Sequence, residues 1–168
     1  DDGGGSDDGG SGGGSGGGSG GSGGSDGGSS GYSTYDGTEG FAYSGGGSYG
    51  DRNCELFWDA EGSPSSMTSG CPDCEFVFDV DMTLRSSSTD DGTCSQIATD
   101  ASFTYGYTDD YYGYGSYLVY YSSYYSQFVA FAGASFSGSN FTYYYGYEDY
   151  PYSGTYYTYT WFGEAQVD

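Results

Sequence analysis

The chain has 168 residues, of which 24 are Asp or Glu and only Arg52 and Arg85 are basic, so that its formal net charge is -22. This charge excludes nucleic acids and anionic membrane surfaces as partners, because affinity for phosphate groups comes from Lys and Arg. No apolar run reaches the roughly 20 residues of a membrane-spanning helix, and we expect no membrane insertion. The partners that remain possible are cations, chiefly calcium, and neutral molecules such as glycans or other copies of the chain.

Residues 1–50 are predicted to form a Gly/Ser/Asp-rich leader, and residues 51–168 a single Tyr-rich domain. Residues 1–30 contain only Gly, Ser and Asp, which bury no apolar surface. Such a segment is either a flexible spacer or an extended strap that packs on neighbouring subunits, since backbones without Cβ atoms approach closely. Aromatic residues first appear between residues 31 and 50, where they would insert into a groove or dock loosely on the chain's own domain. We expect the domain to fold and stay monomeric without residues 1–50.

From Cys54 onward the apolar residues alternate with polar ones, which is typical of strands with one buried face. We expect strands around residues 54–58, 76–84, 102–107, 116–122, 127–136, 140–147 and 155–167. No segment has the pattern of an amphipathic helix. Short polar turns separate the strands, and this predicts an all-β fold in which an antiparallel meander closes as a disulfide-stapled β-sandwich or small barrel.

The four cysteines, Cys54, Cys71, Cys74 and Cys94, predict two disulfides. Their number is even, and they lie within one stretch of a chain that otherwise has the composition of a secreted protein. A zinc site is the weaker alternative, because a zinc ribbon needs a second close pair and the chain has no His. A redox site of the thioredoxin type lacks its βαβ context. A bridge between Cys71 and Cys74 would be strained, and this favours pairing each of them with Cys54 or Cys94.

The cysteine block also carries a resemblance. The runs Cys54-Glu-Leu-Phe-Trp58 and Cys71-Pro-Asp-Cys74-Glu-Phe-Val-Phe-Asp79-Val, followed by Cys94, resemble uncharacterised secreted or lipoprotein-type proteins of myxobacteria-like Gram-negative bacteria. Those proteins also join a Gly/Ser/Asp leader to a Tyr-rich carboxyl half. The resemblance implies export and attachment to the cell surface, with no known activity. In a mature lipoprotein of this kind the first residue is a lipid-bearing Cys, whereas residue 1 here is Asp1.

Tyrosine is the commonest aromatic residue, with 23 copies. Consecutive rings, as in residues 143–145, must point to opposite faces of a strand, so that some lie outside the core. These outer rings are either ordinary exposed tyrosines, contacts between subunits or platforms for sugars. The chain has no Lys, which often protects sheet edges from pairing, and edge pairing between copies is less discouraged than usual.

Two smaller signals concern ligands and modification. Asp79 and Asp81 lie on one face of a predicted strand and are speculative calcium ligands, although no EF-hand spacing is present; solvated acids explain them better. Asn140-Phe141-Thr142 is a glycosylation sequon near a predicted hairpin turn, which makes Asn140 a candidate for an attached glycan.

We expect no enzyme, because without His, Lys or a free thiol a nucleophile lacks its usual activating base. No other cofactor is predicted. The expected location is extracellular or at the cell surface. The first hypothesis is a structural glycoprotein subunit of a fibril, filament or surface assembly, held by contacts between tail and domain and between Tyr-rich surfaces. The alternative is a monomeric cell-surface binding module on a flexible stalk that recognises glycans or calcium.

Overall fold

The computed structural model describes residues 31–47, 50–150 and 154–168. These residues form nine strands and one 3-10 helical turn, η1 (Ser66–Gly70). The strands are β1 (Tyr35–Gly46), β2 (Arg52–Pro64), β3 (Phe76–Leu84), β4 (Thr89–Asp90), β5 (Ala101–Thr108), β6 (Tyr117–Ser122), β7 (Gln127–Ser137), β8 (Asn140–Asp149) and β9 (Tyr156–Val167). The prediction of an all-β chain is confirmed.

The sheet closes on itself. Its strand order is β1-β9-β8-β7-β6-β5-β3-β2, every neighbouring pair is antiparallel, and β1 also pairs with β2. The short β4 adds only to Cys54 and Glu55 of β2. Of the two predicted architectures the structure is therefore the barrel, with eight strands around one interior. A barrel of this size encloses side chains or one small ligand.

The barrel begins earlier in the chain than the sequence indicated. β1 lies within the segment predicted as leader, yet it forms full ladders with β2 and β9 and closes the barrel. Its inward positions run Tyr35, Gly37, Glu39, Phe41 and Tyr43. Two of these five are Gly or Glu, so that the apolar alternation that identifies a strand is interrupted.

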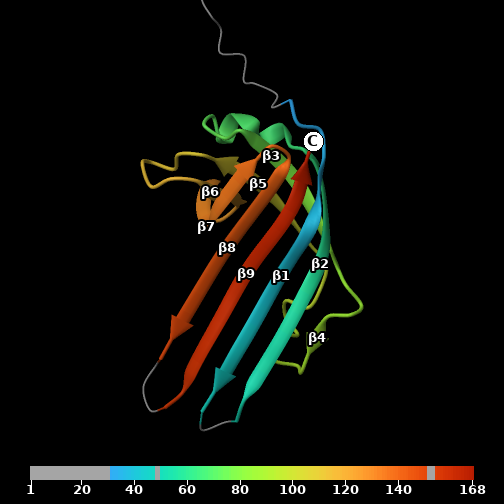
Figure 1. Ribbon diagram of the computed structural model, residues 1–168, viewed down its shortest axis with the longest axis vertical. Coiled ribbons are helices and arrows are strands. Elements are labelled where there is room, and N and C mark those ends of the chain that lie inside the picture. The colour runs from blue at the N-terminus through green and yellow to red at the C-terminus, as the bar shows by residue number, and fades with distance from the viewer. Residues whose placement is uncertain (1–30, 48–49, 151–153) are drawn as a thin grey trace, which may run out of the picture.

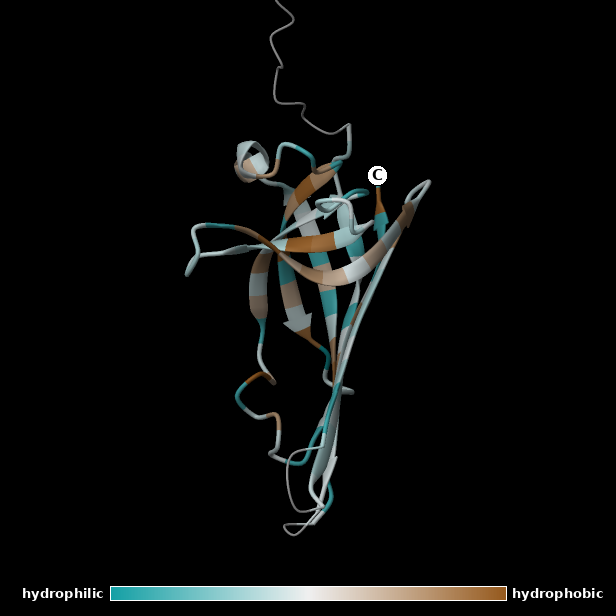
Figure 2. Cartoon of the chain, turned by 90° about the vertical axis from the view of Figure 1, so that its left-hand side faces the viewer, coloured by the Kyte–Doolittle hydropathy of each residue, from teal (hydrophilic) through white to brown (hydrophobic). Residues whose placement is uncertain are grey.

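The strands differ in length, and four of them continue beyond the barrel (Figure 1). β3 pairs with β2 only between Trp58 and Pro64, and β7 pairs with β8 only as far as Tyr144. Beyond these points β8, β9, β1 and β2 form a four-stranded sheet, called here the extension, made of residues 145–149, 156–161, 41–46 and 52–57. A bulge between Leu118 and Val119 accompanies the bend of β7 away from β8. Figure 2 shows the extension edge-on, below the barrel.

The barrel end remote from the extension is filled by aromatic rings. Phe76 is fully buried there and contacts Tyr107, Phe136 and Phe141 at centroid distances of 5.2–5.6 Å. Tyr32, which precedes β1, covers this cluster, with its ring 5.4 Å from that of Phe136. Phe136 and Phe141 pack edge-to-face on Phe76 and Tyr107 stacks on it, and this close packing of rings closes that end. The opposite end, next to the extension, is open.

All four cysteines are bonded, but in pairs other than those favoured from the sequence. One disulfide joins Cys54 of β2 to Cys94 in the loop after β4, and the other joins Cys71 to Cys74. The preference for cross-pairing was wrong, because the turn after η1 folds back on itself: the Cys74 amide donates to the Cys71 carbonyl at 3.0 Å, and the two Cα atoms lie 5.3 Å apart. That separation is ordinary for a disulfide.

None of the helical segments in the described part of the chain is long and apolar enough to span a membrane.

Candidate functional site

An aromatic cavity lies at the open end of the barrel. It has a volume of about 250 Å³ and is lined by Phe103 and Tyr105 of β5, Tyr120 of β6, Phe131 of β7 and Trp161 of β9. Phe103 is 39% exposed although it faces inward, because the neighbouring short strands end near it. The lining carries little polar surface, and apolar, ring-lined hollows with few polar groups are typical ligand sites.

From this cavity a continuous line of rings, the aromatic row, runs along the inner face of the extension. Trp161 contacts Phe41 at 4.6 Å and Phe131 contacts Tyr145 at 5.7 Å between ring centroids. Tyr159 then lies 6.1 Å from Tyr145. The row consists of Phe131, Trp161, Phe41, Tyr145, Tyr159, Tyr147, Tyr157 and Tyr43, and each ring is linked to the others through neighbours whose centroids are at most 6.4 Å apart.

The outer part of the row is accessible and uncharged. Tyr147 is 39% exposed, and Tyr43, Tyr145, Tyr157 and Tyr159 are half-buried. The β3, β5, β6 and β7 strands are too short to cover these rings. The Tyr157 hydroxyl donates to Asp149 at 2.8 Å, and this hydrogen bond raises the pKa of Tyr157 to about 12. The Tyr157 hydroxyl therefore stays protonated at neutral pH.

A carboxyl group lies deeper in the barrel, behind the cavity. Glu39 of β1 is 1% exposed, and its Oε1 accepts a hydrogen bond of 2.9 Å from the Tyr35 hydroxyl. Its Oε2 has no partner, and neither does the buried hydroxyl of Tyr143. Burial raises the pKa of Glu39 to about 8, against the opposing effect of the Tyr35 hydrogen bond. Burial and the nearby Glu39 also raise the pKa of Tyr105, which lines the cavity.

Gly163 of β9 makes room for this group. It pairs with Glu39 on one side and with Tyr143 on the other. A Cβ at this position would lie 2.3 Å from Cε1 of Tyr143 and 2.8 Å from Oε2 of Glu39. The unpartnered carboxyl oxygen and the tyrosine ring therefore meet over the glycine backbone. The next inward residue of β9 toward the open end is Trp161, in the wall of the cavity.

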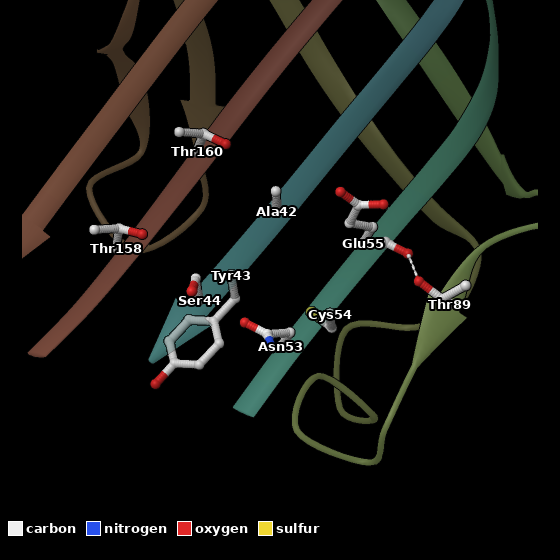
Figure 3. Close-up of a pocket in the computed structure, with 9 residues that line it drawn as sticks. All are labelled: Ala42, Tyr43, Ser44, Asn53, Cys54, Glu55, Thr89, Thr158 and Thr160. Atoms are coloured by element: carbon white, nitrogen blue, oxygen red, sulfur yellow. Dashed lines mark hydrogen bonds between the residues drawn. The ribbon is translucent and has the colours of Figure 1, made fainter. Parts of the chain in front are cut away.

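A larger hollow, of about 370 Å³, lies against the same strands of the extension (Figure 3). Most of its lining residues are small or polar and alternate with the residues of the aromatic row, among them Ala42, Ser44, Thr158 and Thr160. Thr89 of β4 closes one side by donating to the Glu55 carbonyl at 3.5 Å. It holds no buried unpartnered group and no cluster of rings, so that the smaller aromatic cavity is the better candidate despite its size.

The predicted calcium ligands lie on the outer surface of the barrel. Asp79 accepts a hydrogen bond from the Thr104 hydroxyl at 2.7 Å, and Asp81 accepts one from Ser102 at 2.6 Å. Both carboxylates therefore have protein partners on β5, and the structure does not bring them together with the aromatic row. Calcium binding at Asp79 and Asp81 stays a prediction.

Asn140 is exposed at the start of β8, in the turn after β7. Its side-chain oxygen accepts a hydrogen bond of 2.6 Å from Gln166. The position is compatible with the predicted glycan, which stays a prediction.

Potential metal-binding side chains converge closely at one place in the described residues. Cys54, Asp90 and Cys94 lie together there, but both sulfurs belong to one disulfide. Asp90 accepts hydrogen bonds from the backbone amides of Gly92 and Cys94 at 3.0 and 2.9 Å. The carboxylate therefore shapes the loop that carries the disulfide.

The sequence reading missed Glu39 and the continuity of the row. Glu39 lies at an inward position of β1, between Gly37 and Phe41. If residues 35–43 are taken as a strand, the alternation of side chains places Glu39 on the same face as Tyr35 and Phe41, and this could have identified it. The predicted assembly role of the Gly/Ser-rich leader falls largely on residues 1–30, which lie outside the described part of the chain.

Comparisons with protein-family models, with curated proteins and with solved structures gave no match for this chain. The resemblance of the cysteine block to secreted bacterial proteins stays a prediction.

Proposed function

We propose that the protein is an extracellular binding module that recognises neutral glycans along the aromatic row. One observation carries this proposal: eight inward-facing rings form a connected series from the barrel cavity onto the partly exposed inner face of β8, β9 and the end of β1 in the extension. An extended ligand can follow such a series along the tyrosines of the extension.

The chemistry of the row suits sugars. The face of an aromatic ring carries partial negative charge, and the C–H groups on one face of a pyranose are weakly positive. Stacking therefore combines burial of apolar surface with favourable electrostatics. The hydroxyls of Tyr147 and Tyr157 and the carboxylate of Asp149 lie together at the outer end, where they supply hydrogen bonds to sugar hydroxyls.

The charge of the protein selects among glycans. With a net charge of -22, the molecule repels sulfated, uronic-acid and phosphate-bearing polymers over about one Debye length. Neutral glycans meet no such barrier.

Two disulfides and an absence of free cysteine among the described residues are compatible with an oxidising, extracellular location. Glycans are abundant partners in that location.

The test is binding of the full chain to a panel of neutral and acidic oligosaccharides, followed by calorimetry on the tightest neutral binder. Tyr147→Ser and Tyr159→Ser should each weaken binding about twofold to tenfold, the worth of one stacked ring. Tyr114→Ser is the matched control, because Tyr114 is an exposed tyrosine in the loop at the other end of the barrel. Equal losses in all three variants, or a preference for acidic glycans, would contradict the proposal.

A structural subunit is the second candidate, and the free edge of β8 favours it. Beyond Tyr144, β8 pairs only with β9 within the described residues, so that its backbone is open to a strand from another copy. Tyrosine, common at subunit contacts, lines the adjacent face.

Negative-stain electron microscopy of the full chain, with and without calcium, tests this candidate. Regular filaments would support assembly. Dispersed monomers in both conditions would contradict it and leave the binding module.

A further inference from the structure

The aromatic cavity and the buried Glu39 are neighbours within one barrel interior. Tyr105 lines the cavity and is electrostatically coupled to Glu39. Trp161 also lines the cavity, and its inward neighbour on β9 is Gly163, over which the free Oε2 of Glu39 lies. Glu39, Gly163 and Tyr143 do not line the cavity themselves; they lie deeper, behind Tyr105 and Trp161, where a carboxyl oxygen of Glu39 and the hydroxyl of Tyr143 have no protein partner.

No basic residue of the chain is near Glu39. The chain has two, Arg52 and Arg85, and no Lys. Arg85 pairs with Asp59 at 2.7 Å on the outside of the barrel, and Arg52 is exposed at the start of β2. Buried carboxylates are ordinarily paired with a cation. In this barrel no basic side chain pairs with Glu39.

We propose that the cavity binds a small organic ammonium ion with an apolar body, and that Glu39 is its counter-ion. The apolar body lies among Phe103, Tyr120 and Phe131, and the ammonium group points inward toward Oε2 of Glu39 and the Tyr143 hydroxyl. This site shares Phe131 and Trp161 with the aromatic row but uses none of the row's tyrosines, and it does not rest on glycan binding.

Two attractions act together on such a ligand. A cation is drawn to the faces of aromatic rings within about 6 Å, and five rings line this cavity. A carboxylate in a site of low polarity adds a charge-assisted hydrogen bond. With no cation beside it, burial keeps Glu39 protonated at neutral pH, since its pKa is about 8. A bound ammonium group favours the charged form and lowers that pKa.

The size of the cavity limits the ligand. At about 250 Å³ it is below the usual range of pockets for drug-sized molecules, which begins near about 300 Å³. One six-membered ring with a short aminoalkyl arm is the expected scale.

The experiment compares benzylammonium chloride with benzyl alcohol, a neutral molecule of nearly the same shape. Binding to the full chain is measured by calorimetry and by Trp fluorescence at neutral pH and moderate salt. The ammonium ion should bind more tightly, and Glu39→Gln should reduce its affinity about tenfold to a hundredfold, the worth of one charge-assisted hydrogen bond. Binding of the alcohol should change little.

Glu61→Gln is the matched control, because it removes the same charge from an exposed position on the outer face of β2. If it weakens ammonium binding as much as Glu39→Gln does, the attraction comes from the overall charge and the proposal fails. Equal affinity for ammonium ion and alcohol would overturn the proposal, as would no binding of either. Should Glu39→Gln not fold, Tyr143→Phe and the comparison of the two ligands on the unaltered protein still decide. None of these outcomes decides whether glycans bind along the tyrosines of the row, which Tyr147→Ser and Tyr159→Ser test separately.

Discussion

Glu39 is the residue whose placement most needs explanation, because a carboxyl group that is 1% exposed loses nearly all contact with water. The side chain is tolerated because it is held protonated and because Tyr35 donates a hydrogen bond to one of its oxygens. The other oxygen remains unpartnered. Such groups usually lower stability unless a ligand satisfies them.

Glu39 should make stability depend on pH. Its pKa rises on folding from 4.5 to about 8, so that its full contribution to the free energy of unfolding is present below about pH 4.5. As the pH rises toward 8 the unfolded chain releases this proton first, and stability falls by at most about 1.4 kcal/mol per pH unit. Glu39→Gln should remove this component, and urea unfolding at several pH values measures it.

The exposed Glu61→Gln is the control for the general effect of removing one charge. Between pH 5 and 8, the free energy of unfolding of Glu39→Gln should rise steadily relative to that of Glu61→Gln. Parallel pH profiles for the two variants would refute the assigned protonation.

A second prediction at this scale concerns Gly163. A methyl group there would lie 2.3 Å from Tyr143, a distance that forces the ring or the strand to move. Gly163→Ala should lower the free energy of unfolding by about 1–3 kcal/mol, the usual cost of overpacking. Gly133→Ala, where no atom lies within 4 Å of the added Cβ, should have little effect. Similar chemical denaturation curves for both variants would show that the interior at Gly163 is loosely packed.

Among the elements, β1 decides whether a barrel exists. It pairs with β2 over residues 35–45 and with β9 over residues 35–46, and its loss would leave two long open edges. The sequence predicted that the domain folds without residues 1–50. The pairing of β1 with β2 and β9 instead leads us to expect that only residues 1–30 are dispensable for folding.

Deletion of residues 1–30 should leave a folded barrel, because every described contact lies beyond the cut. Deletion of residues 1–46 should abolish the cooperative thermal transition and expose the interior to hydrophobic dyes, since β1 supplies the seam that closes the sheet. Near-ultraviolet circular dichroism distinguishes the two proteins. A cooperative transition in the longer deletion would mean that β2 and β9 close without β1.

Strand prediction succeeded where apolar and polar residues alternate without interruption. Residues 76–84 were predicted as a strand and form β3 (Phe76–Leu84), and residues 127–136 correspond to β7 (Gln127–Ser137). β1 was missed because Gly and Glu occupy inward positions where an apolar side chain is expected. Gly is disfavoured in isolated strands, and only pairing on both sides makes this segment a strand.

For the whole molecule, charge is the dominant property. A net charge of -22 on 168 residues destabilises the compact state by self-repulsion. Only one ion pair, between Arg85 and Asp59, relieves it within the described residues.

Sodium chloride should therefore raise the melting temperature by several degrees between about 0.01 and 0.15 M, as the Debye length falls from about 30 to 8 Å. Calcium at equal ionic strength separates screening from specific binding. An additional increase that Asp79→Asn and Asp81→Asn remove would support the calcium prediction. A melting temperature insensitive to sodium chloride would show that self-repulsion is weak.

The sequence by itself determined the all-β class and the oxidised cysteines, because these depend on local alternation and residue number. The repulsion of polyanions, expected from the summed charge, stays a prediction. The folded structure decided the disulfide pairs: a tight turn joins Cys71 to Cys74, and pairing of β4 with β2 brings Cys94, 40 residues away, to Cys54. It also decided the site. Glu39 is buried because β1 lies between β2 and β9. The aromatic row exists because β8, β9, β1 and β2 extend beyond the ends of the other four barrel strands. Closure of a sheet is a long-range event, and no local pattern specifies which residues will share its interior.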